Sequence, residues 1–383
     1  MSLSAIFSAA AEHYRELDAA ATARRRAGNG AALFPRSFDA ASGSLVMRPW
    51  DDWTNGHWAG ALWLLHEATG DDFFRARAEE WTALLAPCAK IDYHHDVGFI
   101  AMCSFGQGRR ILGTDRYDAV LLETAASLSK RFHPGLGLIR SWGKIDQKDR
   151  FLVIPDNLMN LELLEWAAKA PGGDPRFDAI ARSHADVTMR NHFRSDGGTY
   201  HVLDYDQETG RVKAVERGQG ASCLTAWSRG QAWGVYGYTM MARETGDRRY
   251  LDFARKLADY AINHPGMPED GVPYWDFGAP GEERDSSAGA ILSSALLELA
   301  GFCAAPHAAR YRSFAEKTLA SLSSPAYFSQ GGEAGHFLLK HGMGAKPMGS
   351  EIDVPLVYGD YYFLEALLRL AKIQPSDHPT IQP

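Results

Sequence analysis

The sequence is poor in cysteine: its 383 residues include only four, and no two of them form a CxxC pair. Widely spaced cysteines in or beside apolar stretches are typical of reduced core thiols. Apolar residues never run for about 18 positions, so we predict no transmembrane helix. Residues 1–12 have neither a cationic segment nor a long apolar run, so we expect no signal peptide and a cytoplasmic location.

An excess of positive charge is also missing, because the formal net charge is −7. This balance argues against a basic track for nucleic-acid phosphates and against a patch for anionic membranes. The sequence has no glycine-rich phosphate loop and no GxSxG motif, so nucleotide-binding and serine-hydrolase functions lack support. Consecutive residues rarely face one metal ion, so the run His94, His95 and Asp96 does not predict a metal site. We therefore expect no metal and no other cofactor.

A short motif that recurs along the chain predicts tight turns between helices. Residues 68–73 read Ala-Thr-Gly-Asp-Asp-Phe and residues 244–250 read Glu-Thr-Gly-Asp-Arg-Arg-Tyr, with looser copies at 112–117 and 172–177. Glycine favours the left-handed position that ends one helix, and aspartate favours the capping position that begins the next. Each copy therefore predicts a helical hairpin.

The helices on the two sides of these turns differ in their apolar pattern. Before the turns the chain is apolar on nearly every side, which is typical of a buried helix; after them, as in 250–261, apolar residues keep the i, i+3, i+4 spacing of an outer, amphipathic helix. Inner helices are predicted at 57–68, 97–105, 158–168, 230–242, 286–300 and 360–370, and further outer helices at 5–17 and 308–322. The pattern predicts one all-α domain over residues 1–383, an (α/α)6 toroid of six hairpins closed in a ring.

Long connections return from the outer helices to the inner ones, over about 133–155, 194–227, 263–284 and 324–359. In a ring of hairpins they lie on one face, where the inner helices begin, and long ordered loops on a rigid scaffold usually carry function. The positive ends of the inner-helix dipoles meet on the same face, which suits an anionic ligand. This face is therefore the predicted mouth of an active site.

Carboxylates, aromatic rings and arginines gather at the predicted starts of the inner helices. Aromatic rings stack on sugars and arginine binds carboxylates, so the set is typical of a sugar-acid site. Several of these residues have a structural alternative. Asp156 taken alone is more typical of a helix cap, and so are Asp285 and Asp360. Arg229 can bind a ligand anion or pair with a neighbouring carboxylate.

Seven segments, spread in order from residue 53 to residue 363, form a specific pattern when taken together. They are Trp-Thr-Asn-Gly at 53–56, His-Asp-Val-Gly-Phe at 95–99, Asp-Asn-Leu-Met-Asn-Leu at 156–161, Trp-Ser-Arg-Gly-Gln-Ala-Trp at 227–233, Gly-Val-Pro-Tyr-Trp-Asp-Phe at 271–277, Arg-Asp-Ser-Ser-Ala at 284–288 and Tyr-Gly-Asp-Tyr-Tyr-Phe at 358–363. The pattern resembles the bacterial unsaturated glucuronyl hydrolases of glycoside hydrolase family 88, whose fold is an (α/α)6 barrel.

The resemblance implies a hydrolase that removes a 4,5-unsaturated glucuronic acid from the non-reducing end of oligosaccharides made by polysaccharide lyases. In this family C4 of the vinyl ether is protonated, C5 takes water, and the hemiketal opens to release the next sugar. The resemblance implies that Asp156 acts as general acid and base and that Asp96 assists it. It also implies substrate contacts by Trp53, His95, Trp142, His201, Gln219, Arg229, Trp233 and Lys346. The implied partner is an unsaturated uronic-acid oligosaccharide, bound by a monomer or homodimer without a cofactor.

The sequence leaves three other functions open. An unsaturated rhamnogalacturonyl hydrolase shares the barrel, although the Trp-Thr-Asn-Gly segment favours the glucuronyl type. A sugar epimerase relies on paired histidines at the barrel centre, and the histidines here do not recur there. A carbohydrate-binding protein without catalysis would not need Asp156. Family members that prefer sulfated disaccharides carry a Ser-x-x-Ser-x-Lys segment, of which only Lys346 is kept here, so the leaving sugar stays undetermined.

Overall fold

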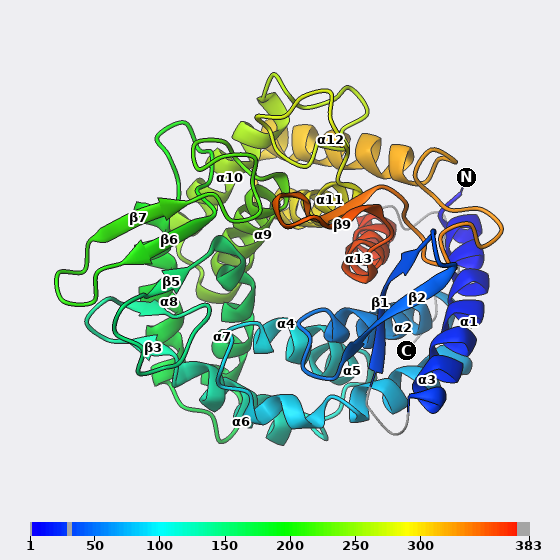
Figure 1. Ribbon diagram of the computed structural model, residues 1–383, viewed down its shortest axis with the longest axis horizontal. Helices are drawn as coiled ribbons and strands as arrows, with labels where there is room; N and C mark the ends of the chain where they lie inside the picture. The colour runs from blue at the N-terminus through cyan, green and yellow to red at the C-terminus, as the bar shows by residue number, and fades with distance from the viewer. Residues whose placement is uncertain (1, 29–32, 374–383) are drawn as a thin grey trace.

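The computed structural model describes residues 2–28 and 33–373, and its helices form a ring in which one set faces the axis (Figure 1). The inner set consists of α2 (Asn55–Thr69), an interrupted helix from α4 (Val97–Ala101) to α5 (Gln107–Leu112), α7 (Leu161–Lys169), α9 (Ser228–Thr245), α11 (Ser286–Gly301) and α13 (Val357–Ile373). Each inner helix contacts the next, and α13 contacts α2. The inner set therefore closes on itself.

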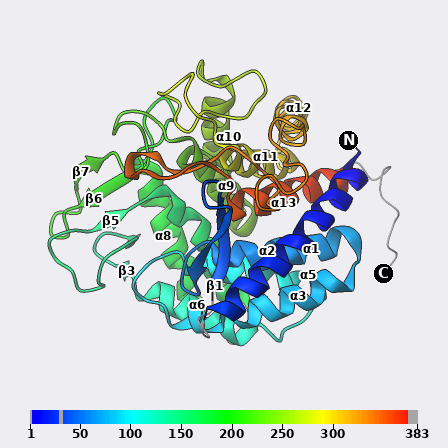
Figure 2. The same cartoon turned by 45° about the vertical axis from the view of Figure 1, so that its right-hand side comes forward.

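A second set of helices covers the outside of the ring. It consists of α1 (Leu3–Ala27), α3 (Asp72–Ala83), α6 (Asp118–Ser129), α8 (Arg176–Asn191), α10 (Arg248–Asn263) and α12 (Ala305–Leu322). Figure 2 shows α1 running along the outside beside α2 and α3. Of 16 residues in each helix, outer α10 buries five and inner α11 buries 13. The predicted alternation of buried and amphipathic helices is present.

The two close copies of the turn motif have the predicted backbone. Gly70 and Gly246 end α2 and α9 with φ values of 69° and 67°, in the left-handed region that glycine adopts readily. The side chains of Asp71 and Asp247 each accept a hydrogen bond of 2.9 Å from a backbone N–H in the next helix. The looser copies meet the prediction only in part. Gly113 ends α5 in the left-handed region, but no side chain caps α6, and α7 ends at Ala170 in an extended conformation.

The all-α prediction was incomplete, because the described residues also contain four small antiparallel sheets, all in loops that return from outer to inner helices. Their strands are β1 (Leu33–Asp39), β2 (Ser44–Pro49), β3 (Phe132–His133), β4 (Leu138–Ile139), β5 (Leu152–Val153), β6 (Val202–Tyr205), β7 (Val212–Glu216), β8 (Gly342–Ala345) and β9 (Ser350–Val354). Strands of two to seven residues, several interrupted by bulges, show too little alternation to be recognised in sequence. The β5–β6–β7 sheet joins the loop before α7 to the loop before α9.

Two inner helices begin or continue differently from the prediction. The predicted helix at 97–105 extends to Leu112, with a π-helical turn, η2 (Met102–Gly106), between α4 and α5. The predicted helix at 158–168 is preceded by a 3₁₀ helix, η3 (Pro155–Asn160), whose proline fits the first helical position. The sequence stretch around residue 156 is therefore already helical where it reaches the mouth of the ring.

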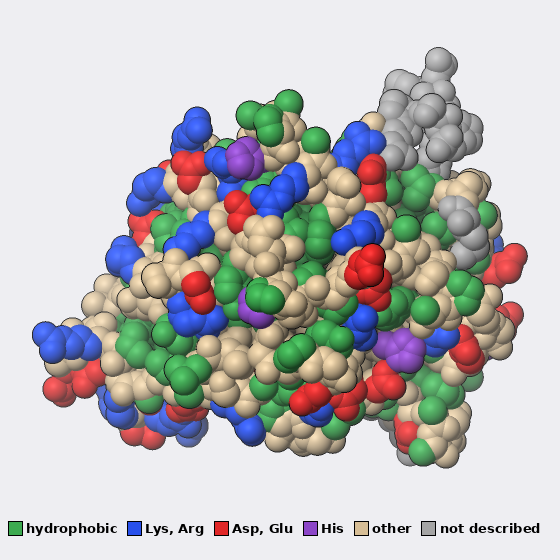
Figure 3. Space-filling view, turned by 90° about the horizontal axis from the view of Figure 1, so that it is seen from above, with side chains coloured by type: hydrophobic (Ala, Val, Ile, Leu, Met, Phe, Trp, Pro, Cys, Tyr) green, Lys and Arg blue, Asp and Glu red, His purple; other side chains and the backbone are tan. Residues whose placement is uncertain are grey.

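On the face drawn in Figure 3, basic and acidic side chains of the described residues are interspersed, without an extended basic track. Among residues 2–28 and 33–373, every helix is too short or too polar to cross a bilayer.

Candidate active site

Asp96 and Asp156 lie at the starts of neighbouring inner helices, α4 and the η3–α7 unit. Ser141, in the loop between them, holds both segments. Its carbonyl accepts a hydrogen bond of 3.1 Å from the backbone N–H of His95, and its hydroxyl accepts one of 3.1 Å from the N–H of Ile154. The two carboxylates therefore belong to one site.

The start of α4 packs directly on the end of η3. The N–H of Phe99 donates to Asn160 Oδ1 at 3.0 Å. A Cβ added to Gly98 would lie 2.5 Å from Asn160 Cα, closer than real carbon atoms approach. Glycine at position 98 therefore allows close contact between the helices that carry Asp96 and Asp156.

Helix capping does not account for the two candidate catalytic residues. The side chains of Asp96 and Asp156 make no capping hydrogen bond in α4 or η3. Asp285, in contrast, accepts from two N–H groups of α11, so its predicted capping role is confirmed. The same prediction is wrong for Asp360, which lies within α13 and accepts from two N–H groups of the last loop at 2.9 Å.

Asp156 has the properties of a proton donor at neutral pH. Its Oδ2 atom is buried and has no hydrogen-bond partner. Burial raises the pKa of the Asp156 carboxyl from 3.8 to about 7, against the opposing effects of the Arg229 charge and the residue's own N–H. A carboxyl that is half protonated near pH 7 can donate a proton and, once ionised, accept one.

His201 faces Asp156 in a fixed tautomer. Its Nδ1 atom accepts a hydrogen bond of 2.8 Å from the N–H of Gln219, so the ring proton is on Nε2. The Nε2 atom lies 3.8 Å from Asp156 Oδ2. Burial lowers the pKa of His201 to about 3, and its ring packs 4.4 Å from that of Trp227. His201 is therefore a neutral donor beside the free oxygen of Asp156.

Asp96 lies against two histidines, and its pKa depends on the charge of Asp156. Its Oδ1 atom is 3.2 Å from His95 Nε2, and its N–H donates to His94 Nδ1 at 3.1 Å. Burial, followed by the charges of Asp156 and Asp52, raises the pKa of Asp96 well above its usual value. An ionised Asp156 thus favours the protonated form of Asp96, which is the behaviour of two acids that share a site.

Three of the predicted tryptophans lie at different depths of this site. Trp142 is 37% exposed and meets the ring of His95 edge-on at 6.1 Å. Trp53 is partly buried, 4.9 Å from the ring of Tyr358. Trp233 is fully buried, and its Nε1 has no partner. Trp142 and Trp53 are therefore accessible to a ligand, whereas Trp233 lies beneath the site.

The predicted polar contacts Arg229, Gln219 and Lys346 all bind protein groups. Arg229 donates to Asp285 at 2.8 Å, to the carbonyl of Gly344 at 2.7 Å and to that of Met343. Gln219 Nε2 also donates to the Gly344 carbonyl, at 2.9 Å. Lys346 pairs with Glu282 and Glu283. These contacts tie the β8–β9 hairpin to the site.

The described residues contain no group of His, Cys, Asp or Glu side chains arranged to hold a metal ion.

Residues outside the predicted set also shape the site: His94 holds the backbone of Asp96, and Trp227 supports His201. Buried Asn157 donates to the Ile139 carbonyl at 3.0 Å beside Asp156. The only sequence signal for these three residues was that each adjoins a predicted one or lies in the same motif.

Comparisons with known proteins find relatives along most of the chain. The chain is 42% identical over 344 residues to the unsaturated glucuronyl hydrolase of Formosa agariphila, covering 89% of this chain and 85% of that protein. It superimposes with a TM-score of 0.89 on a crystal structure of an unsaturated glucuronyl hydrolase specific for heparin, at 40% identity and over 98% and 99% of the two chains.

A third match is a variant enzyme from Streptococcus agalactiae, crystallised in complex with dGlcA-GalNAc6S. Its TM-score is 0.79 at 27% identity, over 97% of this chain and 92% of that one. No protein-family model matches the chain. Because a relative above 40% identity spans most of both sequences, the chain belongs to the unsaturated glucuronyl hydrolases, which are glycoside hydrolases.

Proposed function

We propose that this chain removes a 4,5-unsaturated glucuronic acid from the non-reducing end of lyase-generated oligosaccharides, with Asp156 as general acid and base. The observation that carries the proposal is the buried, unpartnered oxygen of Asp156, whose carboxyl has a pKa of about 7 and lies beside a second carboxylate. Protonation of a carbon atom needs an acid of raised pKa in a site from which water is largely excluded.

The proposed reaction is hydration of a vinyl ether. Protonated Asp156 delivers its proton to C4, and the C4=C5 electrons leave a positive charge that C5 shares with the ring oxygen. The Asp156 carboxylate then takes a proton from the water that adds to C5. The resulting hemiketal opens to a ketone at C5, and the next sugar is released. Because C5 rather than the anomeric carbon is attacked, the carboxylate spacing of ordinary glycosidases does not apply.

The other site residues have supporting roles in this proposal. Neutral His201 and His95 have ring nitrogens without a hydrogen-bond partner among the described residues, which can bind the substrate without opposing the protonated state of Asp156. Asp96, whose own pKa is raised by burial and by the charge of Asp156, holds substrate hydroxyls. Trp142 and Trp53 stack on the sugars, and Trp233 supports the floor of the site.

The charge around Lys346 bears on the leaving sugar. Two carboxylates, Glu282 and Glu283, already neutralise its ammonium group, so a sulfate placed there would meet net negative charge. We therefore propose that the enzyme prefers a leaving sugar without a sulfate at this position. The relatives reported above are glucuronyl hydrolases, so the rhamnogalacturonyl alternative is not favoured.

We also propose that the ring of six inner and six outer helices is a single catalytic domain of the (α/α)6 type. Alternation of the two sets and closure of α13 on α2 support this assignment. A reducing, cytoplasmic location is part of the same proposal, supported by the four cysteines, all of which are free thiols.

The direct test follows the ultraviolet absorbance of the conjugated C4=C5 bond when enzyme is mixed with unsaturated disaccharides. Products of chondroitin, hyaluronan, heparin, gellan, xanthan and ulvan lyases form the panel, with a matched chondroitin pair that differs only in one sulfate. We expect the absorbance to decay for at least one product, and faster for the unsulfated member of the pair. Stable absorbance across the panel would overturn the proposed function.

The pH dependence of kcat should report the Asp156 carboxyl. A general acid with a pKa of about 7 loses its proton as pH rises, so kcat should fall up to about tenfold per pH unit above neutrality. Native Asp156 also binds its proton more tightly than the unfolded chain, where the pKa is 3.8, so its contribution to stability is lost as pH rises to about 7. A kcat that stays level up to pH 9 would contradict the assignment.

Gly98→Ala tests the packing that brings the two acids together. The added methyl group would lie 2.5 Å from Asn160 Cα and must push α4 away from η3. We expect kcat to fall by about 100-fold, because displacements near 1 Å are costly in a positioned site. Gly301→Ala, at the end of α11 with no atom near its Cβ, should leave kcat unchanged. Equal activity of the two variants would refute the role of this contact.

A further inference from the structure

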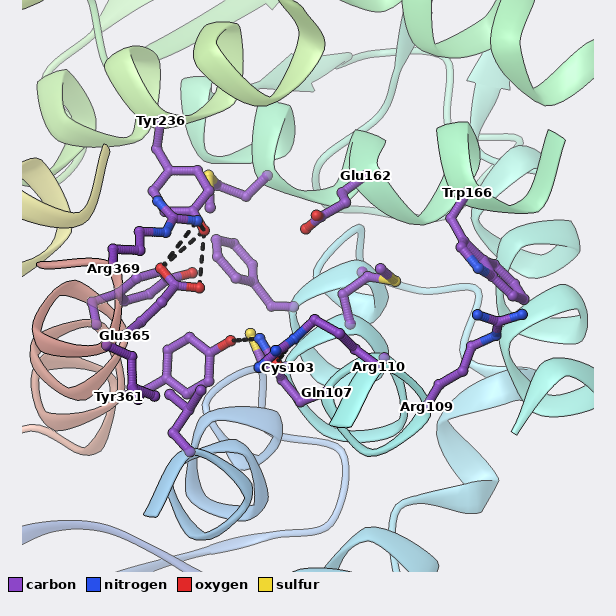
Figure 4. Close-up of a pocket in the computed structure, with 18 of the residues that line it drawn as sticks. Cys103, Gln107, Arg109, Arg110, Glu162, Trp166, Tyr236, Tyr361, Glu365 and Arg369 are labelled. Carbon is purple, nitrogen blue, oxygen red and sulfur yellow. Dashed lines mark hydrogen bonds and ion pairs between the residues drawn. The ribbon is translucent and has the colours of Figure 1, made fainter. Parts of the chain in front are cut away.

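A cavity of about 510 Å³ lies inside the ring, away from the candidate active site. Its walls come from α2, α4–α5, α7, α9 and α13, and much of the lining belongs to the C-terminal parts of these helices (Figure 4). The candidate catalytic residues are at the other end, where the inner helices begin. Cavities of several hundred Å³ are the usual size of sites for small molecules.

A layer of large side chains separates this cavity from the active site. Phe99 lines the cavity, and its ring also contacts those of Trp53 and Trp233, at 5.5 and 5.1 Å. Neither Asp96 nor Asp156 lines the cavity. The cavity is therefore distinct from the site proposed for hydrolysis.

The charged groups of the lining form matched pairs. The five cations at the wall are Arg109, Arg110, Arg243, Arg369 and Lys372, and their carboxylate partners are Asp118, Glu67, Glu162, Glu244, Glu298 and Glu365. Every one of these cations thus has a carboxylate partner. A ligand with net charge would have to break one of these pairs, the more buried of which are those of Arg243 and Arg369, and leave a charge uncompensated, which is unfavourable. The lining therefore suits a neutral ligand.

Hydrogen-bonding groups and aromatic faces alternate around the same wall. Tyr236 accepts from Arg369 at 2.8 Å and donates to Glu365 at about 3 Å, and Tyr361 accepts from Gln107 at 2.7 Å. Across the space, Figure 4 shows Glu162 pointing toward the cavity and Trp166 beside Arg109. A ligand hydroxyl can donate and accept at once, so it can bind both members of such a pair. Aromatic rings in addition stack on the apolar face of a sugar.

The backbone that lines the cavity is irregular where it meets the empty space. Met102, Cys103 and Gly106 of the π-helical turn η2 all line the cavity, and this turn interrupts the second inner helix. Single π-helical turns within α-helices are uncommon and frequently mark functional sites. The turn is thus a second observation, independent of the charge pattern, that favours a ligand over structural water alone.

We propose that this cavity is a second binding site, separate from the catalytic one, for a neutral saccharide of one or two units. The matched ion pairs supply donors and acceptors, and Trp166 and Tyr361 supply the aromatic faces. The proposal does not depend on the hydrolytic function, because none of the residues assigned to catalysis lines the cavity.

The test is a titration of neutral saccharides that lack a uronic acid, namely glucose, galactose, N-acetylglucosamine, N-acetylgalactosamine and maltose. Binding is followed by saturation-transfer NMR and calorimetry. Leu368→Trp fills the cavity from α13, and Ile373→Trp places the same side chain on the exposed end of that helix, outside the lining. We expect millimolar binding to the unmodified protein, weakened at least about tenfold in Leu368→Trp and unchanged in Ile373→Trp.

Hydrolysis of an unsaturated disaccharide should continue in Leu368→Trp, since that assay reports only the catalytic site. Thermal unfolding shows whether Leu368→Trp is folded. If it is not, Trp166→Ala, which removes a stacking face, should instead show the weaker saccharide binding. A crystal soaked with the best saccharide should show it between Trp166 and Tyr361. The proposal is overturned if no saccharide binds, if Leu368→Trp and Trp166→Ala bind as tightly as the unmodified protein, or if only water fills the cavity.

Discussion

Asp156→Asn should lower kcat by about 100-fold to 10,000-fold while KM changes by less than about threefold. Asparagine keeps the size of the side chain but cannot deliver a proton to C4 or take one from water. The free oxygen of Asp156 and its pKa of about 7 are the features that the substitution removes. Initial rates of C4=C5 absorbance loss, together with the affinity of the inactive variant for the disaccharide, measure both quantities.

Asp360→Asn is the matched control for that substitution. Asp360 is also buried, and burial raises its pKa to about 7, but its oxygens accept from Tyr14 and from two backbone N–H groups. A raised pKa without a free oxygen in the site should not contribute to catalysis. We expect kcat of Asp360→Asn to stay within about threefold of the unmodified enzyme, with some loss of stability. An Asp156→Asn variant as active as this control would remove the basis for the mechanism.

Asp285→Ala should reduce the free energy of unfolding by about 3–5 kcal/mol, because it leaves the buried Arg229 guanidinium without its carboxylate. Asp285 is fully buried and Arg229 is 1% exposed, so water cannot replace the lost partner. The same carboxylate caps α11 and accepts from the N–H of Met343, so the β8–β9 hairpin should loosen as well. Urea unfolding at constant pH measures the change.

Asp252→Ala provides the comparison at the surface. Asp252 pairs with Arg248, the two side chains are 53% and 82% exposed, and exposed pairs contribute little to stability. We expect no decrease in the urea midpoint for this variant. If Asp285→Ala unfolds at the same urea concentration as Asp252→Ala, the buried pair does not hold the last loop in place.

Much of the ring could be predicted because its helices differ in amphipathic pattern. α11, in which Glu298 is the single charged residue, and amphipathic α10 have clearly different sequences, and burial follows that difference. The π-helical turn η2 could not be predicted, because one extra residue in a helical turn barely changes the apolar spacing around it. The small sheets were missed for a related reason: two-residue strands such as β5 are defined by partners about 50 residues away.

The sequence brought the candidate residues to one face of the ring but did not predict their hydrogen bonds. The resemblance implied an acid at Asp156, yet the pKa of this residue depends on burial by distant segments. Arg229 was expected either to bind a ligand anion or to pair with a carboxylate. In the structure Arg229 pairs with Asp285, which lies 56 positions further along the chain, and donates to two backbone carbonyls more than 100 positions away. The tautomer of His201 likewise depends on the backbone of Gln219.

Hydrolysis in D₂O tests the central claim most directly, because vinyl-ether hydration and attack at the anomeric carbon leave different marks. Delivery of a solvent-derived proton by Asp156 should place deuterium at C4 of the released keto acid at early times, as read by NMR of the unsaturated disaccharide reaction. In Asp156→Asn, both the turnover of the disaccharide and the labelling of C4 should be much slower than in the unmodified enzyme. An early product that still contains the C4=C5 bond and carries no deuterium at C4 would contradict the account.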